Sequence, residues 1–169
     1  HVRYDLDKGG FVELPGLCES AEDMRKLASK EGFYEAFKDD HVVHLYTLRE
    51  GGEARTDELQ KLAEAFGLDV DLANADSRQE DAKQLHIKYG LKSTEFIVDK
   101  LQKWADENGR KLMVLLSYDT PPVKTYIETG ERFDQEFVEF MEKGGYTYVD
   151  CLQKAADDYK DYKISVDQF

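Results

Sequence analysis

The chain has 169 residues, of which 41% are hydrophobic and 35% are charged, a composition typical of one compact globular domain and not of a disordered segment. Its 36 acidic residues outnumber the 23 basic ones, and the resulting net charge of -13 is spread along the sequence. Such a surface repels polyanions at long range. We therefore expect neither nucleic acid nor an anionic membrane as a partner.

Targeting and redox signals are few. No apolar run approaches the roughly 20 residues of a membrane-spanning helix, and no signal peptide is recognisable, so we expect a soluble protein and leave its compartment open. The chain begins at His1 and not at Met, which leaves open that it is processed or a piece of a longer protein. Cys18 and Cys151 lie far apart without CxxC spacing, and free buried thiols are expected rather than a disulfide.

The N-terminal segment, residues 1–17, is predicted to be irregular and β-like, with short strands at 2–6 and 11–14 around Gly9-Gly10. Ser20 then predicts the start of a helix, because carboxylates follow it in the first turn, and Gly32 is expected to end that helix. The aromatic residues at 33–37 indicate a further short turn or helix.

The middle of the chain alternates predicted strands and helices. Residues 41–48 (HVVHLYTL) favour a strand buried on at least one face, and Thr56 is expected to cap a helix that stops at Gly67. Residues 68–73 alternate apolar and acidic side chains, as a half-exposed strand does. Two helices are then predicted, one from a Ser77/Glu80 capping box to Gly90 and one from Ser93 to Gly109.

The run Lys111 to Tyr118 (KLMVLLSY) is the most strand-like in the chain. Its five consecutive apolar residues, 112–116, predict a central parallel strand buried on both faces, which Asp119-Thr120-Pro121-Pro122 ends. A helix around 133–141, a strand at 146–150 and a helix at 152–162 complete the pattern.

Strands separated by helices predict one α/β domain over residues 1–169. Its expected core is a mainly parallel sheet of about four to five strands with helices on both faces, as in Rossmann-like and flavodoxin-like three-layer sandwiches.

Ligands of open parallel sheets bind outside the carboxyl ends of the strands. The polar residues expected at those ends form a candidate ligand-binding rim: Glu50, Asp76, Ser117, Asp119 and Asp150. Such carboxylates would hold Mg²⁺ through oxygen ligands or divide into an acid and a base, although Asp is also common in turns, where it binds its own backbone.

Other sequence signals for a metal or cofactor are weak. His41 and His44 would point to opposite faces of a strand, so one ion could not easily use both, and His86 stands alone in a helix. The chain has no HExxH, no glycine-rich phosphate loop, no paired CxxC and no GxSxG. We therefore expect no cofactor and assign no metal ligand.

From about His41 onward the chain resembles the later part of an SGNH (GDSL-type) hydrolase domain. The resemblance rests on the segments HVVHLYTL, LKSTEFIVDKLQKWADENG, KLMVLLSYD and ERFDQEFVEFMEKGGYTYVDCLQ, in that order. It implies an α/β fold and an ester or an acetylated carbohydrate as substrate. The Gly-Asp-Ser, Gly-x-Asn-Asp and Asp-x-x-His blocks of such enzymes have no counterpart here, so the resemblance assigns no catalytic residue.

Three functions follow as hypotheses. The first is a segment or degenerate relative of an SGNH-like esterase, with a small ester or carbohydrate as ligand. The second is a non-catalytic α/β domain that binds a protein or a small ligand at the rim. The third is a Mg²⁺-dependent enzyme that uses Asp119 and Asp150.

Overall fold

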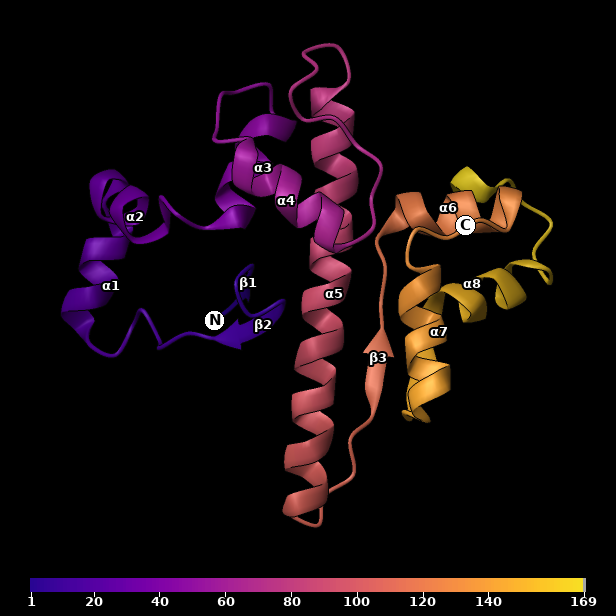
Figure 1. The fold of residues 1–169 in the computed structure, drawn as a ribbon. Helices are drawn as coiled ribbons and strands as arrows, with labels where there is room; N and C mark the ends of the chain where they lie inside the picture. Colours follow the sequence, from indigo (N-terminus) through magenta and orange to yellow (C-terminus); the bar gives the residue numbers. More distant parts are fainter. Residues whose placement is uncertain (169) are drawn as a thin grey trace. The chain divides into compact units, whose positions relative to one another are not determined.

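The structure is a computed structural model that describes residues 1–168 (Figure 1). The described elements follow one another in the order β1 (Val2–Asp5), β2 (Gly10–Glu13), α1 (Ala21–Ala28), α2 (Lys30–Phe37), α3 (His41–Arg49), α4 (Asp57–Ala65), α5 (Arg78–Glu107), β3 (Val114–Leu116), α6 (Thr120–Thr129), α7 (Gln135–Gly144), β4 (Tyr148–Asp150), α8 (Cys151–Tyr159) and the 3-10 helix η1 (Val166–Gln168). The chain divides into two compact units, a first unit of residues 1–96 and a second unit that begins at Ile97.

Helices dominate both units, and the predicted α/β sandwich is wrong. Strands within residues 1–168 form only two separate pairs, the antiparallel pair β1–β2 and the parallel pair β3–β4. The expected sheet of four to five strands fails because two of its predicted strands, 41–48 and 68–73, adopt other conformations.

The hairpin β1–β2 confirms the two β-like pieces near the N-terminus. Tyr4 pairs with Phe11 across the strands, and their rings meet edge to face with centroids 5.2 Å apart. The backbone N–H of Tyr4 donates to the hydroxyl of Tyr89 at 3.1 Å. The hairpin is thereby tied to helix α5 by a contact between residues 85 positions apart in the sequence.

Helix α1 begins where the sequence predicts. Ser20 is its N-cap, and Ser20 and Asp23 form a reciprocal capping box that satisfies free backbone amides at the helix start. The predicted stop at Gly32 is wrong, because α1 already ends at Ala28 and Gly32 lies within α2. Ser29 separates the two helices and accepts a hydrogen bond from the Gly32 amide.

The predicted strand at 41–48 is wrong, since these residues belong to helix α3. Asp40 caps this helix, because its Oδ1 accepts a hydrogen bond from the Val42 amide at 2.9 Å. The buried residues His41, Leu45 and Leu48 recur at the spacing of one helix face. The β-branched pair that favours a strand is outweighed by this cap and by burial of that face.

Helix α4 ends at the predicted glycine. Gly67 follows the C-cap Phe66 with φ +69°, a left-handed conformation that glycine adopts without steric cost. The predicted strand at 68–73 is wrong. Hydrogen bonds of its backbone go to a side chain and not to a neighbouring strand. The side-chain Nε2 of Gln60 donates to the Val70 carbonyl at 2.9 Å, and its Oε1 accepts from the Leu72 backbone amide at 3.2 Å.

The core of the first unit is one cluster of buried side chains. Its members come from α3, α4, the segment after α4 and the first part of α5: Leu45, Leu48, Leu59, Leu62, Ala63, Val70, Leu72, Ala82, Leu85 and Tyr89.

Helix α5 is continuous for 30 residues, so the predicted break at Gly90 is wrong. Ser93 does not cap a new helix. Its hydroxyl and that of Thr94 donate instead to the Gly90 carbonyl within α5, at 2.9 and 2.8 Å. None of the described helices, α5 included, is long and apolar enough to cross a membrane.

The second unit has little sheet. Only Val114–Leu116 of the predicted strand 111–118 form β3, and burial on both faces is wrong, because Met113 and Leu115 are exposed while Leu116 is buried. The strand at 146–150 and the helices at 133–141 and 152–162 are confirmed in shorter or shifted form as β4, α7 and α8. Pro121 and Pro122 do more than end β3, since they form the first turn of α6.

Candidate functional site

The five predicted rim residues divide between the two units. Glu50 follows helix α3 and pairs with Arg49 at 3.2 Å, and Asp76 lies in the turn before α5. Neither follows a strand, so the common sheet edge that would gather all five does not exist. Ser117, Asp119 and Asp150 do follow or end the parallel pair β3–β4.

Ser117 and Asp119 are exposed. Asp119 occupies the N-cap position of α6, yet its side chain accepts no capping hydrogen bond there. Ser117 makes no side-chain hydrogen bond within residues 1–168, so it has no neighbouring base of the kind that activates a serine nucleophile. No three His, Cys, Asp or Glu side chains of the described chain group as a metal site would require.

Asp150 has two structural roles. Its Oδ1 accepts hydrogen bonds from the backbone amides of Leu152 and Gln153, at 3.0 and 3.3 Å, and so caps helix α8. Its Oδ2 accepts a hydrogen bond from Arg132 Nη1 at 2.6 Å. Both carboxylate oxygens are therefore occupied within the protein.

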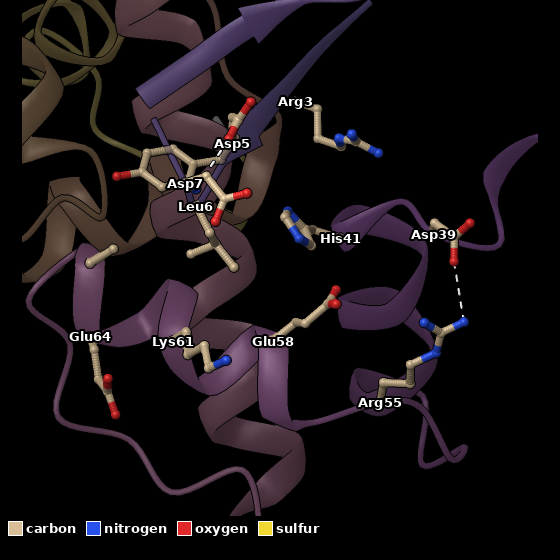
Figure 2. Close-up of a pocket in the computed structure, with 12 residues that line it drawn as sticks. Arg3, Asp5, Leu6, Asp7, Asp39, His41, Arg55, Glu58, Lys61 and Glu64 are labelled. Carbon is tan, nitrogen blue, oxygen red and sulfur yellow. Dashed lines mark hydrogen bonds and ion pairs between the residues drawn. The ribbon is translucent and has the colours of Figure 1, made fainter. Parts of the chain in front are cut away.

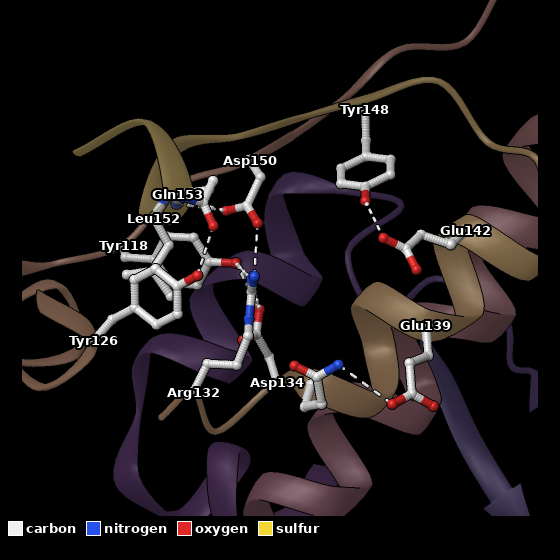
Figure 3. Close-up of polar contacts among 11 residues, drawn as sticks. Tyr118, Tyr126, Arg132, Asp134, Glu139, Glu142, Tyr148, Asp150, Leu152 and Gln153 are labelled. Atoms are coloured by element: carbon white, nitrogen blue, oxygen red, sulfur yellow. Dashed lines mark hydrogen bonds and ion pairs between the residues drawn. The ribbon is translucent and has the colours of Figure 1, made fainter. Parts of the chain in front are cut away.

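Arg132 is the centre of a buried polar cluster that also contains Tyr118, Asp134 and Asp150, which we call the Arg132 cluster (Figure 3). Arg132 Nε donates to Asp134 Oδ1 at 2.8 Å and Nη2 to Asp134 Oδ2 at 3.1 Å, a bidentate pair. Arg132 Nη2 also donates to the Tyr118 hydroxyl at 2.9 Å, which in turn donates to Asp134 Oδ2 at 2.5 Å. The guanidinium lies 5.8 Å from the ring centre of Tyr126.

The electrostatics of the Arg132 cluster favour the charged forms of both Arg132 and Asp134. Burial opposes charge on Arg132, but its hydrogen bonds to Asp134 and Asp150 raise the pKa of the guanidinium. Burial likewise opposes charge on Asp134, but the bonds from Arg132 and Tyr118 lower the pKa of that carboxyl. Burial and the bond to Asp134 both raise the pKa of Tyr118.

The Arg132 cluster is therefore suited to a structural task. Its donors and acceptors already bind one another, and the raised pKa of Tyr118 opposes formation of a phenolate. Its hydrogen bonds and ion pairs join the segment after β3, the residues before α7 and the end of β4. It holds these elements together.

The other face of the β3–β4 pair is apolar and open to solvent. Along β3 the side chains alternate, with Leu116 buried and its neighbour Leu115 61% exposed. Leu115 is paired in register with Val149 of β4, which is 42% exposed, and Met113 just before β3 is 66% exposed. We call Met113, Leu115 and Val149 the outer sheet face.

A second exposed apolar stripe lies in the same unit. Ile97, Leu101 and Trp104 recur at helical spacing on α5, and all three are exposed, whereas Val98 and Ala105 of the same helix are buried. A groove of about 690 Å³ adjoins the outer sheet face where the strands begin. Met113 and Thr147 line it together with Gln102, Asp106 and Tyr146.

Comparison with known proteins gives no match. No protein-family model matches the chain, and neither a curated protein nor a solved structure does. The resemblance to SGNH hydrolases therefore stays a prediction.

Sequence reasoning includes Asp150 among the candidates but misses Arg132, Asp134 and Tyr118. The available signal is the Arg-x-Asp spacing at 132–134, which places two opposite charges beside a predicted helix start. Sequence reasoning also misses the outer sheet face, because a run of apolar residues is read as buried.

Proposed function

We propose that the chain is a non-catalytic protein-binding module that receives an amphipathic helix of a partner protein on its outer sheet face. The observation that supports this proposal is the exposure of Met113, Leu115 and Val149 on a parallel strand pair. Parallel sheets are normally covered on both faces, usually by helices.

The outer sheet face differs from an ordinary solvent-facing sheet surface. A half-exposed strand alternates apolar and polar residues, with the polar ones outward, but here Met113 and Leu115 point outward and remain apolar. Burial of one such side chain contributes about 1.5–3 kcal/mol. Contiguous exposed apolar patches of this kind mark interaction sites in monomeric proteins.

A helix is the occupant that the geometry favours. Helices cover parallel sheets in α/β folds because an apolar helix stripe fits the pleated face. The net charge of -13 favours a partner helix whose polar side is basic, since opposite charge speeds encounter and excludes acidic competitors.

The test compares two methionines of nearly equal exposure. Met113→Lys alters the outer sheet face, whereas Met24→Lys alters helix α1 in the first unit, where Met24 is 64% exposed. Both purified variants and the unmodified chain are used to capture proteins from source-cell extract, and a photo-crosslinker at position 115 identifies what contacts the face. Circular dichroism confirms that each variant is folded.

We expect one protein that is captured by the unmodified chain and by Met24→Lys, is lost with Met113→Lys, and crosslinks at position 115 through a helical basic segment. Equal capture by all three chains contradicts the proposal. A second copy of the chain is the alternative occupant, and sedimentation of the pure chain tests it. A dimer that Met113→Lys dissociates would contradict the proposal.

The esterase and the Mg²⁺-dependent enzyme stay predictions. The first requires the missing serine and histidine blocks, and the second requires Asp119 and Asp150 to share one ion. Both oxygens of Asp150 already have partners within the protein, which disfavours the second hypothesis.

A further inference from the structure

The first unit contains a pocket of about 760 Å³, a volume typical of sites for small ligands (Figure 2). Three elements form it: strand β1 with the turn that follows it, the start of helix α3, and helix α4. The pocket lies entirely within residues 1–96, so it is independent of the outer sheet face.

His41 is the buried polar group of this pocket. It is only 6% exposed, and its ring lies edge to face with Tyr89, with centroids 6.2 Å apart. Its Nδ1 is buried and has no hydrogen-bond partner within residues 1–168. Because Nδ1 is sealed from the pocket, Nε2 is the ring nitrogen left to bind a ligand there. Burial lowers the pKa of His41, so the ring is neutral and offers one donor.

Charged side chains of both signs surround His41, and Figure 2 shows its ring between Arg3 and Glu58. Their charges act on the pKa of His41 in opposite directions, since Glu58 raises it and Arg3 lowers it. Arg55 and Asp39 neutralise each other at 3.2 Å. Arg3, Lys61 and Glu58 make no ion pair with any residue of the described chain, although all three line the pocket.

Unpaired charges of opposite sign on the walls of one pocket match a ligand that has both charges itself. A carboxylate would pair with Arg3, which can bind it through two N–H groups, and would accept a hydrogen bond from neutral His41. An ammonium group would pair with Glu58. A ligand with only one charge would leave without a partner either the cations of the pocket or the carboxylates that make no ion pair within the described chain, which are Glu58 together with Asp7 and Glu64.

We propose that the pocket around His41 binds a small zwitterion that bears a free carboxylate and a free ammonium group, such as an amino acid or a dipeptide. The class follows from the unpaired Arg3, Lys61 and Glu58, which line one pocket together with the buried imidazole of His41.

The test uses the full chain and ligand-detected NMR with the standard amino acids and a set of glycyl dipeptides, followed by calorimetry on each binder. Calorimetry compares three forms of each ligand that binds: the free form, the C-terminal amide and the N-acetyl form. We expect the free form to bind and each blocked form to bind at least about tenfold more weakly, because each loses a charge-assisted contact.

Two variants assign the contacts. With Arg3→Gln, the advantage of the free form over the amide should disappear, and with Glu58→Gln, its advantage over the N-acetyl form should disappear. Arg25→Gln and Glu22→Gln, which alter an exposed pair on α1, serve as matched controls and should leave binding unchanged. Failure of every probe to bind, or equal binding of free and blocked forms, overturns the proposal.

Discussion

The two units of the chain are stabilised in different ways. The first has a continuous apolar core to which α3, α4 and α5 all contribute, and nine of its ten buried members are 3% exposed or less. The second places an ionic cluster among its buried apolar residues and exposes apolar side chains on its paired strands, as at Leu115 and Val149.

The two units therefore differ in how a single substitution affects their stability. An apolar core gains its stability from burial within the unit. A buried ion pair contributes less net stability, because desolvation offsets most of its attraction, but losing one partner is costly. The second unit therefore combines buried ion pairs that are costly to break with an exposed apolar sheet face.

The largest effect is expected in the Arg132 cluster. Asp134→Ala removes the bidentate partner of Arg132 and the acceptor of Tyr118, and should lower the free energy of unfolding by about 3–5 kcal/mol. Urea denaturation measures the loss, and hydrogen exchange should show it chiefly in peptides after Ile97. Asp157→Ala removes an exposed pair with Lys160 and should leave the midpoint almost unchanged. A similar midpoint for both variants would show that the cluster is dispensable.

A slightly smaller effect is expected in the first unit. Leu62 is fully buried at the centre of the apolar cluster, so Leu62→Ala leaves a cavity and should cost about 2–5 kcal/mol. Hydrogen exchange should now increase chiefly in α3, α4 and the first part of α5. Leu17→Ala, at a side chain 37% exposed, is the control. If Leu62→Ala instead loosened mainly the second unit, the contrast between the two units would be wrong.

The smallest effect is a pH dependence of the first unit. Burial lowers the pKa of His41 below the value of 6.5, and Arg3 and His44 lower it further, while Glu58 and Asp40 act in the opposite direction. A lowered folded-state pKa means that the neutral ring's contribution to stability is complete above about pH 6.5 and is lost as the pH falls through the folded-state pKa.

Urea midpoints measured from pH 8 down to pH 5 should therefore fall, and the fall should be shallower in His41→Phe. His86→Phe serves as the comparison, because burial also lowers the pKa of His86 and each variant should remove only its own part. An unchanged slope in His41→Phe would mean that His41 does not titrate differently on folding.

Some local signals of the sequence predict local structure correctly, whereas the helix stops predicted at Gly32 and Gly90 are wrong. The cap at Ser20, the left-handed Gly67 and the hairpin are confirmed, because each depends on residues near in sequence. Cys18 and Cys151 are free as predicted, but their predicted burial is wrong, since Cys18 is exposed and Cys151 is only partly buried. The strand prediction at 41–48 fails although a helix signal is present, since Asp40 is a good N-cap and the buried residues recur every three to four positions.

What the sequence does not reveal depends on distant residues. Nothing near Arg132 indicates that its second partner is Asp150, 18 residues away, and nothing near Leu115 indicates that its face lacks a covering helix. The apolar run at 112–116 favours burial on average, and only the arrangement in space shows that alternate residues of it are exposed.

The two roles of Asp150 also have an evolutionary consequence. Asparagine at this position would keep the cap on α8 but lose the charge that Arg132 requires, and glutamate would keep the charge but move it away from the helix start. Positions 132 and 150 are therefore expected to covary among homologues. Their aspartate and arginine should be kept or lost together, while neighbouring exposed positions drift.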